Sequence, residues 1–135
     1  MTDATVMRLE EMETFYDGLV TRTRASLGVS SLGMQFFRYP PEFDQYPNHH
    51  HGEGQVDPGQ EEVYVPITGS ATLEIDGERH TLEPGTWARV GISQLRRLVP
   101  GPQGLEILVL GGTPGKAFVP PAWTQLGAAP PSMPE

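Results

Sequence analysis

Three consecutive histidines, His49, His50 and His51, are the residues of this chain best suited to chemistry. Residues two apart in an extended segment point to the same side, so His49 and His51 would present their imidazoles together while His50 faces away. A strand-like run that opens with the carboxylates Glu61 and Glu62 follows shortly afterwards. Two imidazole nitrogens and a carboxylate oxygen form a ligand set that suits divalent transition metals. The pattern therefore indicates the start of a metal site.

The rest of the chain offers few residues to complete such a site. The remaining histidine, His80, lies in a predicted hairpin, and no histidine follows it. The 135 residues include no cysteine, which excludes disulfides, thiol catalysis and cysteine-held zinc or iron–sulfur centres. Any metal would have to be held by nitrogen and oxygen atoms.

Composition limits the class of protein. A chain of this length is expected to form one domain with a single core, and its 16 glycines and 14 prolines favour many turns and few long helices. The net charge of −8 argues against nucleic acid or an anionic membrane surface as a partner. The N-terminal residues lack a signal-peptide pattern, and no apolar run approaches the roughly 20 residues of a membrane span. We therefore expect a cytoplasmic protein.

Residues 61–82 carry the clearest β-strand pattern. Glu62 and Tyr64 alternate with apolar residues, so they would share one face of a strand. The pair Asp76-Gly77 predicts a two-residue hairpin turn, because both turn positions favour positive φ. That turn would place Glu74 opposite Arg79 as a cross-strand pair of opposite charge.

Several further strands are expected, and together they indicate an antiparallel sandwich or barrel. The turn-like stretches Gly91–Ser93 and Pro100–Gly104 should separate the later strands. We expect Met34, Phe36 and Trp87 to line the core, and Phe118 and Trp123 to pack over the barrel. The predicted strands are 31–39, 86–90, 95–99 and 105–110. The chain is expected to divide into an N-terminal appendage of short helices with irregular links at 1–30, a β-barrel at 31–126 and a frayed tail at 127–135.

The spacing of these residues resembles the first motif of the cupin superfamily, which runs G, five residues, H-x-H, three or four residues, E, six residues, G. His49 and His51 supply the histidines, and six residues separate Glu62 from Gly69. The hairpin and the following Pro84-Gly85 turn also fall in register. The resemblance covers residues 31–110 and implies an all-β fold, a cupin-type antiparallel β-barrel (a double-stranded jelly roll) with a short N-terminal helical or irregular appendage.

The chain departs from the motif at three places. Ten residues lie between His51 and Glu62, where the family has three or four. Phe43 occupies the spacing of the leading glycine. The usual fourth ligand, a histidine about twelve residues after the proline of the Pro-Gly turn, falls on Arg96. Alternation alone leaves open whether Arg96 or Arg97 points inward, and the motif position favours Arg96.

The resemblance implies that His49, His51 and Glu62 bind a divalent transition metal, Fe, Mn, Ni, Cu or Zn, in a cavity that takes a small molecule. Oxygenation, isomerisation and decarboxylation all occur in the superfamily, so the fold leaves open both the reaction and whether the protein is an enzyme. A guanidinium cannot bind a metal, so Arg96 would orient an anionic substrate. Tyr64, on the Glu62 face, would reach the same cavity.

Other interpretations remain open from the residues alone. The protein could be a metal-free binding or sensing module with Arg96 as its ligand anchor and no catalysis. It could be a structural dimerisation module with a filled interior, or the histidines could lie in a solvent-exposed polar loop. The apolar face formed by Val63, Val65 and Ile67 would point outward and need a cover, either from the N-terminal segment or from a second subunit. A homodimer is therefore expected.

Overall fold

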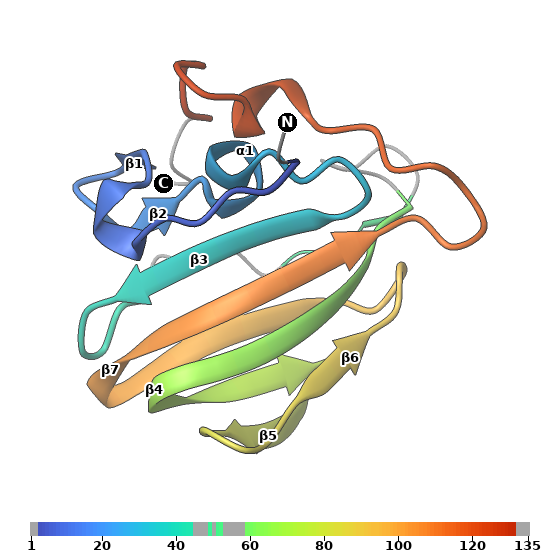
Figure 1. Ribbon diagram of the computed structural model, residues 1–135. Coiled ribbons are helices and arrows are strands. Elements are labelled where there is room, and N and C mark those ends of the chain that lie inside the picture. The colour runs from blue at the N-terminus through green and yellow to red at the C-terminus, as the bar shows by residue number, and fades with distance from the viewer. Residues whose placement is uncertain (1–2, 45–48, 50, 53–58, 132–135) are drawn as a thin grey trace.

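Antiparallel strands curl around one core in the computed structural model, which describes residues 3–44, 49, 51–52 and 59–131 (Figure 1). The sheet order is β1-β2-β3-β7-β4-β5, with β6 pairing with β4. The elements are β1 (Thr14–Phe15), β2 (Val20–Thr21), the short helix α1 (Thr23–Leu27), β3 (Gly33–Tyr39), β4 (Glu61–Ile75), β5 (Glu78–Leu82), β6 (Ala88–Val90) and β7 (Arg96–Gly112), with 3-10 turns at Leu9–Glu11 and Ala122–Thr124. None of the described helices is long and apolar enough to cross a membrane.

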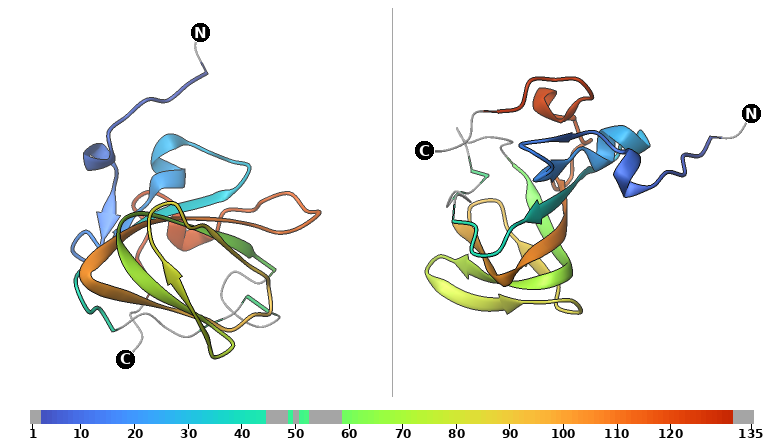
Figure 2. Two further views of the ribbon diagram at one scale, coloured as in Figure 1. Left: turned by 90° about the horizontal axis from the view of Figure 1, so that it is seen from below. Right: turned by 90° about the vertical axis from the view of Figure 1, so that its left-hand side faces the viewer.

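The two longest strands, β4 and β7, form the frame of the barrel. They pair along nearly their whole length, and the register shifts where both strands bend, between Pro66 and Ala71 on β4. Figure 2 shows the resulting curl. The bend depends on Gly69, whose φ is +78° and where a Cβ atom would lie 2.1 Å from the carbonyl oxygen of Gly104. Only glycine fits this position, because it has no Cβ atom and tolerates positive φ.

The barrel interior follows the alternation predicted for β4. Tyr64 and Leu73 are fully buried, and they pack with Leu98 and Ile107 of β7. Ile67, on the predicted outer face, is 48% exposed. The hairpin register is as predicted, with Glu74 opposite Arg79.

One predicted interruption is wrong. Residues 100–104 were expected to separate two strands, but β7 runs without a break from Arg96 to Gly112. The glycines in this stretch allow the strand to bend and to approach its neighbour closely. A Cβ atom at Gly101 would lie 2.6 Å from Oγ of Ser70, so the bend replaces the turn that the sequence indicated.

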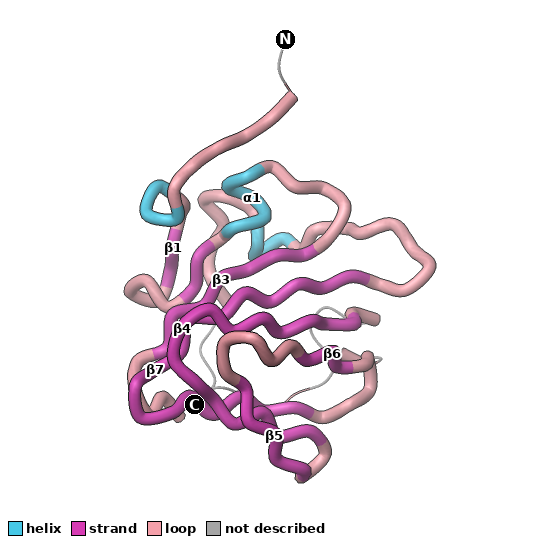
Figure 3. The backbone as a smooth tube through the Cα atoms, turned by 60° about the horizontal axis from the view of Figure 1, so that its bottom comes forward, coloured by secondary structure: helices cyan, strands magenta, loops and turns pink. Residues whose placement is uncertain are grey.

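The N-terminal region and Trp87 also differ from expectation. Residues 1–30 were expected to form only short helices and irregular links, yet β1 and β2 extend the sheet beyond β3, on the side away from β5 (Figure 3). Trp87 does not line the core, since it is 70% exposed, whereas Phe36 is buried and Met34 half-buried. Trp87 and Arg89 share the outer face of the chain at β6, while Val90 takes the buried position.

Candidate metal centre

Backbone hydrogen bonds hold the two outer histidines beside the start of β7. The amide of His49 donates to the carbonyl of Arg96 (2.9 Å), and the amide of Arg96 donates back to His49 (2.8 Å). The amide of His51 donates to the carbonyl of Ile92 (2.8 Å). The rings of His49 and His51 have centroids 5.1 Å apart and are nearly perpendicular. Their side chains therefore meet at one place, as the spacing predicts; His50 lies outside the described residues.

The Glu62 side chain, on β4, lies close to both histidines. Its Oε1 lies 3.0 Å from Nε2 of His51 and 4.0 Å from Nε2 of His49. One ligand atom from each of the three residues lies within 4.8 Å of the others. The ten-residue separation between His51 and Glu62 therefore does not prevent the three side chains from converging.

Tyr64 and Arg96 reach the same carboxylate. The hydroxyl of Tyr64 donates to Oε1 of Glu62 (2.9 Å), and Nη1 of Arg96 lies 3.5 Å from that oxygen. Arg96 is fully buried, and its Nη2 donates to the carbonyl of Gly91 (2.6 Å). Its Nε and Nη1 have no hydrogen-bond partner in the described part of the chain. Arg96 thus points into the barrel, while Arg97 is only half-buried.

The surroundings of Glu62 favour its charged form. Burial raises the pKa of Glu62, but hydrogen bonds from His51 and Tyr64, together with the electrostatic interactions with His51 and His49, outweigh burial and hold the pKa below its ordinary value. Glu62 is therefore a carboxylate at neutral pH and offers a negatively charged oxygen to any cation that enters the group.

The donor set fits a divalent transition metal. Ligands about 2.1 Å from one tetrahedrally coordinated ion lie about 3.4 Å apart, so ligand atoms that are now within 4.8 Å of one another would have to draw together by up to about 1.4 Å. Two imidazoles and one carboxylate with no sulfur donor suit Fe, Mn or Zn. The chain supplies no fourth histidine here, and the charge on Arg96 partly neutralises the carboxylate that a metal would need. His80 is exposed on β5 and lies outside the group.

A pocket that was not expected from the sequence adjoins this group, because Glu62 is one of its lining residues. Its walls come from the inner face of the sheet, including Gln35 and Val109, and from the C-terminal segment, including Trp123. Phe118 packs against the sheet as expected, 3.4 Å from the position of a Cβ atom at Gly33. Arg24 of α1 also lines the pocket. Nothing in the local pattern around Arg24 marks it, because only the fold brings α1 to the end of the barrel.

Comparison with solved structures shows the cupin fold. A cupin protein from Bacteroides fragilis superposes with a TM-score of 0.65 at 18% identity, covering 90% of this chain and 93% of the other. A sugar phosphate isomerase of the cupin superfamily from Silicibacter pomeroyi gives a TM-score of 0.64 at 21% identity, over 79% and 74% of the two chains. A Cupin 2 conserved barrel domain protein from Salinispora arenicola gives 0.62 at 14%, over 84% and 91%. No protein-family model and no curated protein sequence matches the chain.

Proposed function

We propose that this cupin-fold protein binds one divalent transition metal through His49, His51 and Glu62 and acts on a small molecule at that site. The observation that carries the proposal is the convergence of three ligand atoms within 4.8 Å from two separate segments of the chain. The charged state of Glu62 supports it, because a metal requires deprotonated ligands.

A metal held by three protein ligands keeps coordination positions open and would supply Lewis acidity there. Around it, Tyr64 fixes the orientation of the Glu62 carboxylate through its hydroxyl. Arg96 places a permanent cation beside the same group and would orient an anionic part of the substrate. The solved neighbours include a sugar phosphate isomerase, which makes isomerisation one reaction to test alongside oxygenation and decarboxylation.

Metal content of tag-free protein tests the proposal. We expect close to one equivalent of metal after incubation with Fe(II), Mn(II) or Zn(II), and a loss to below about a tenth of an equivalent in Glu62→Gln or His51→Ala. His80→Ala is the matched control, because His80 is an exposed histidine outside the group and its loss should leave metal content unchanged. Wild-type protein that stays below about a tenth of an equivalent with every metal would overturn the proposal.

A metal-free binding module is the second candidate, and the position of Arg96 favours it. Its guanidinium already lies 3.5 Å from Glu62 and keeps two buried nitrogens without a hydrogen-bond partner among the described residues. In this alternative Arg96 anchors an anionic ligand and no turnover occurs. Thermal stabilisation by small acids that persists in chelator, and is lost in Arg96→Met, would support it.

The homodimer and the cytoplasmic location expected from the sequence stay predictions. The outer face of β4, where Ile67 is 48% exposed, is the surface on which a second subunit is expected. Sedimentation equilibrium of wild-type protein and Ile67→Ser would test it. A concentration-dependent dimer that weakens in the variant is expected, and a monomer at all concentrations would contradict it.

A further inference from the structure

The C-terminal segment, residues 113–128, lies over one end of the barrel beside α1 (Figure 1). Its half-buried aromatic side chains contact the sheet: Phe118 lies 3.4 Å from the position of a Cβ atom at Gly33, and the ring of Trp123 meets that of Phe15 edge-on at 6.2 Å. No described strand pairs with the segment, and the backbone hydrogen bonds described within it join residues three positions apart. The segment is therefore attached through side chains and through its last residues, and not as a strand of the sheet.

The space between this segment and the sheet is too small for a small-molecule substrate. The segment and the inner face of the sheet border a cavity of about 70 Å³, whose lining includes Val109 and the candidate ligand Glu62. A volume of that size holds only a few water molecules, whereas sites for small molecules measure about 300 Å³ or more. A small molecule that is to act beside Glu62 from this side of the barrel therefore needs the segment to move aside.

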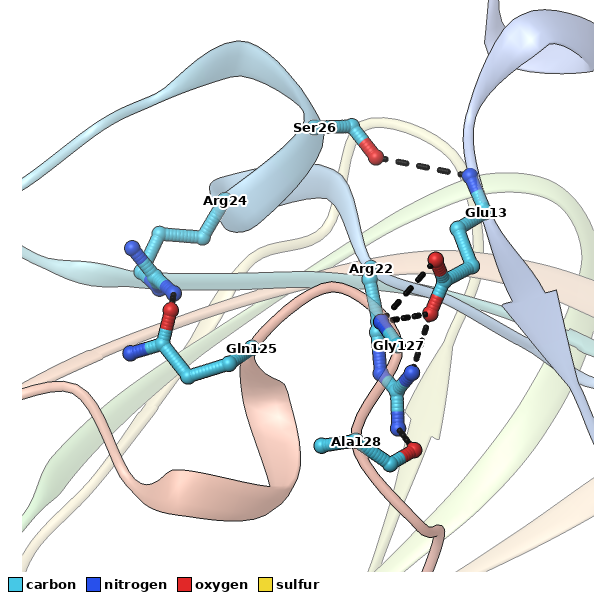
Figure 4. Close-up of polar contacts among 7 residues, drawn as sticks. All are labelled: Glu13, Arg22, Arg24, Ser26, Gln125, Gly127 and Ala128. Carbon is cyan, nitrogen blue, oxygen red and sulfur yellow. Dashed lines mark hydrogen bonds and ion pairs between the residues drawn. The ribbon is translucent and has the colours of Figure 1, made fainter.

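Glu13, which lies just before β1, fastens the far end of the segment (Figure 4). Its two carboxylate oxygens accept the amide of Gly127 at 2.8 and 3.1 Å. Arg22 pairs with Glu13, and its Nη2 donates to the carbonyl of Ala128 (2.7 Å). Arg22 itself is held in place, because it is 2% exposed and its guanidinium lies over the ring of Phe15. We call Glu13, Arg22, Gly127 and Ala128 the latch.

The contacts of the latch are separate from the strand pairing of the barrel. The Glu13 side chain is 35% exposed, so water can replace its partners when the segment lifts. The other polar tie described between the segment and the rest of the chain, from Nη2 of Arg24 to Oε1 of Gln125, is long at 3.4 Å. The opposite end of the segment leaves β7 through a turn that contains Gly115, whose φ is +70°. Separation of β4 from β7 would instead break a long strand pairing, so the segment should open at a lower free energy than the barrel.

We propose that residues 113–128 form a lid, that the latch holds it closed, and that it opens to admit a small molecule to the space beside Glu62. The buried parts of Phe118 and Trp123 favour the closed state, since lifting the lid returns their apolar surface to water. The inference rests on the proposed function in one respect, because it takes the small molecule to act beside Glu62. The opening itself requires neither metal nor substrate and can be measured without them.

Labelling of single cysteines measures the opening, because the chain contains no cysteine of its own. Val109→Cys places a thiol on the cavity wall under the lid, where dithiobis-nitrobenzoate, a disulfide reagent larger than the cavity, can react only with the open state. We expect Val109→Cys to react at least about tenfold more slowly than Val119→Cys, at a position on the lid that is 79% exposed. Addition of Glu13→Ala should speed the labelling of Val109→Cys at least about tenfold and leave that of Val119→Cys unchanged. Should Glu13→Ala fail to fold, Glu13→Gln decides, since it removes only the charge that pairs with Arg22 and should speed the same labelling at least about threefold.

Two controls separate release of the latch from a general loss of stability. Glu10→Ala removes an exposed carboxylate three residues before Glu13 and should leave every labelling rate unchanged. Ala71→Cys tests the barrel itself, because Ala71 is 4% exposed and pairs with Leu82 of β5. This thiol should react slowly both with and without Glu13→Ala.

Three results would overturn the inference. They are labelling of Val109→Cys as fast as that of Val119→Cys in the latched protein, labelling of Val109→Cys that neither Glu13 variant speeds, and an equal gain in speed at Ala71→Cys, which would show that Glu13→Ala loosens the whole barrel. Metal content measured on the latched protein separates the two proposals. Latch-dependent labelling without metal binding refutes only the metal site, and metal binding without latch-dependent labelling refutes only this inference.

Discussion

Replacement of Arg96 by methionine separates the metal site from a metal-free ion pair. The guanidinium lies 3.5 Å from Glu62, and at an effective dielectric constant of about 20 this attraction amounts to roughly 5 kcal/mol. The desolvation of the buried cation, several kcal/mol, offsets part of that attraction. The hydrogen bond to Gly91 is lost as well. The expected net loss in the free energy of unfolding is therefore about 2–4 kcal/mol without metal, or roughly 10 °C in Tm for a chain of this length.

Saturating zinc should narrow the difference in stability, by about 1.4 kcal/mol for each factor of ten in zinc affinity. In Arg96→Met the Glu62 carboxylate no longer has a fixed cation beside it, so a divalent ion should bind at least about tenfold more tightly than in the wild type. The assay is urea unfolding of both proteins in chelator and again in saturating zinc. The histidine segment should stay in place, because it pairs with the backbone of Arg96 and not with its side chain.

Arg97→Met is the matched control for this experiment. Arg97 is the adjacent residue on the opposite face of β7 and is only half-buried, so its loss should change stability by less than about 1 kcal/mol and leave the zinc response unchanged. The reasoning fails if Arg96→Met is as stable as wild type in chelator. It also fails if zinc stabilises the wild type and Arg96→Met equally.

Three further expectations follow from the fold. Gly69→Ala should destabilise the protein by more than about 3 kcal/mol in urea unfolding, because its Cβ atom would lie 2.1 Å from a carbonyl oxygen of β7. Gly77→Ala is the control: Gly77 also has positive φ but faces open space, so this variant should lose only about 1 kcal/mol of stability. Equal losses in the two variants would refute the clash. Hydrogen bonds from the amide of Gly127 and from Arg22 hold the pKa of Glu13 below the ordinary 4.5. The Glu13 carboxylate therefore stabilises the fold above about pH 4.5, and this stabilisation disappears as the pH falls through the lowered pKa. Glu13→Gln should therefore be less stable than wild type near neutral pH and approach it in acid, and a constant gap in unfolding experiments across pH would contradict this. Trp87→Gln should shift stability by less than about 0.5 kcal/mol, since the ring is 70% exposed, and a loss above about 2 kcal/mol would show that Trp87 packs in the core.

Strand content was predictable from the sequence wherever the signal was local. The alternation around Glu62 and Tyr64 placed both side chains inside the barrel, and Asp76-Gly77 fixed the hairpin register. These features depend on residues one or two positions apart, and a strand side chain has only two directions to choose from. Strand alternation also places Trp87 outside, beside Arg89, although its aromatic character favours the core.

Contacts between distant segments could not be predicted in the same way. The continuity of β7 through residues 100–104 depends on Gly101, which lies close to Ser70 of β4, and on Gly104, which lies close to Tyr39 of β3; the turn-like composition conceals both contacts. The approach of His51 to Glu62 depends on backbone hydrogen bonds to residues about forty positions further along the chain. The pocket at Arg24 requires α1, the sheet and the C-terminal segment to meet at one end of the barrel.

The sequence by itself therefore determined which side chains could bind a metal and on which face of their strands they lie. Only the tertiary structure decided that His49 and His51 meet Glu62, that Arg96 rather than Arg97 shares that carboxylate, and that the C-terminal segment lies over the end of the barrel beside Glu62. The physical reason is that side-chain direction follows from the local geometry of the backbone. Convergence and burial depend instead on how the whole chain encloses its core.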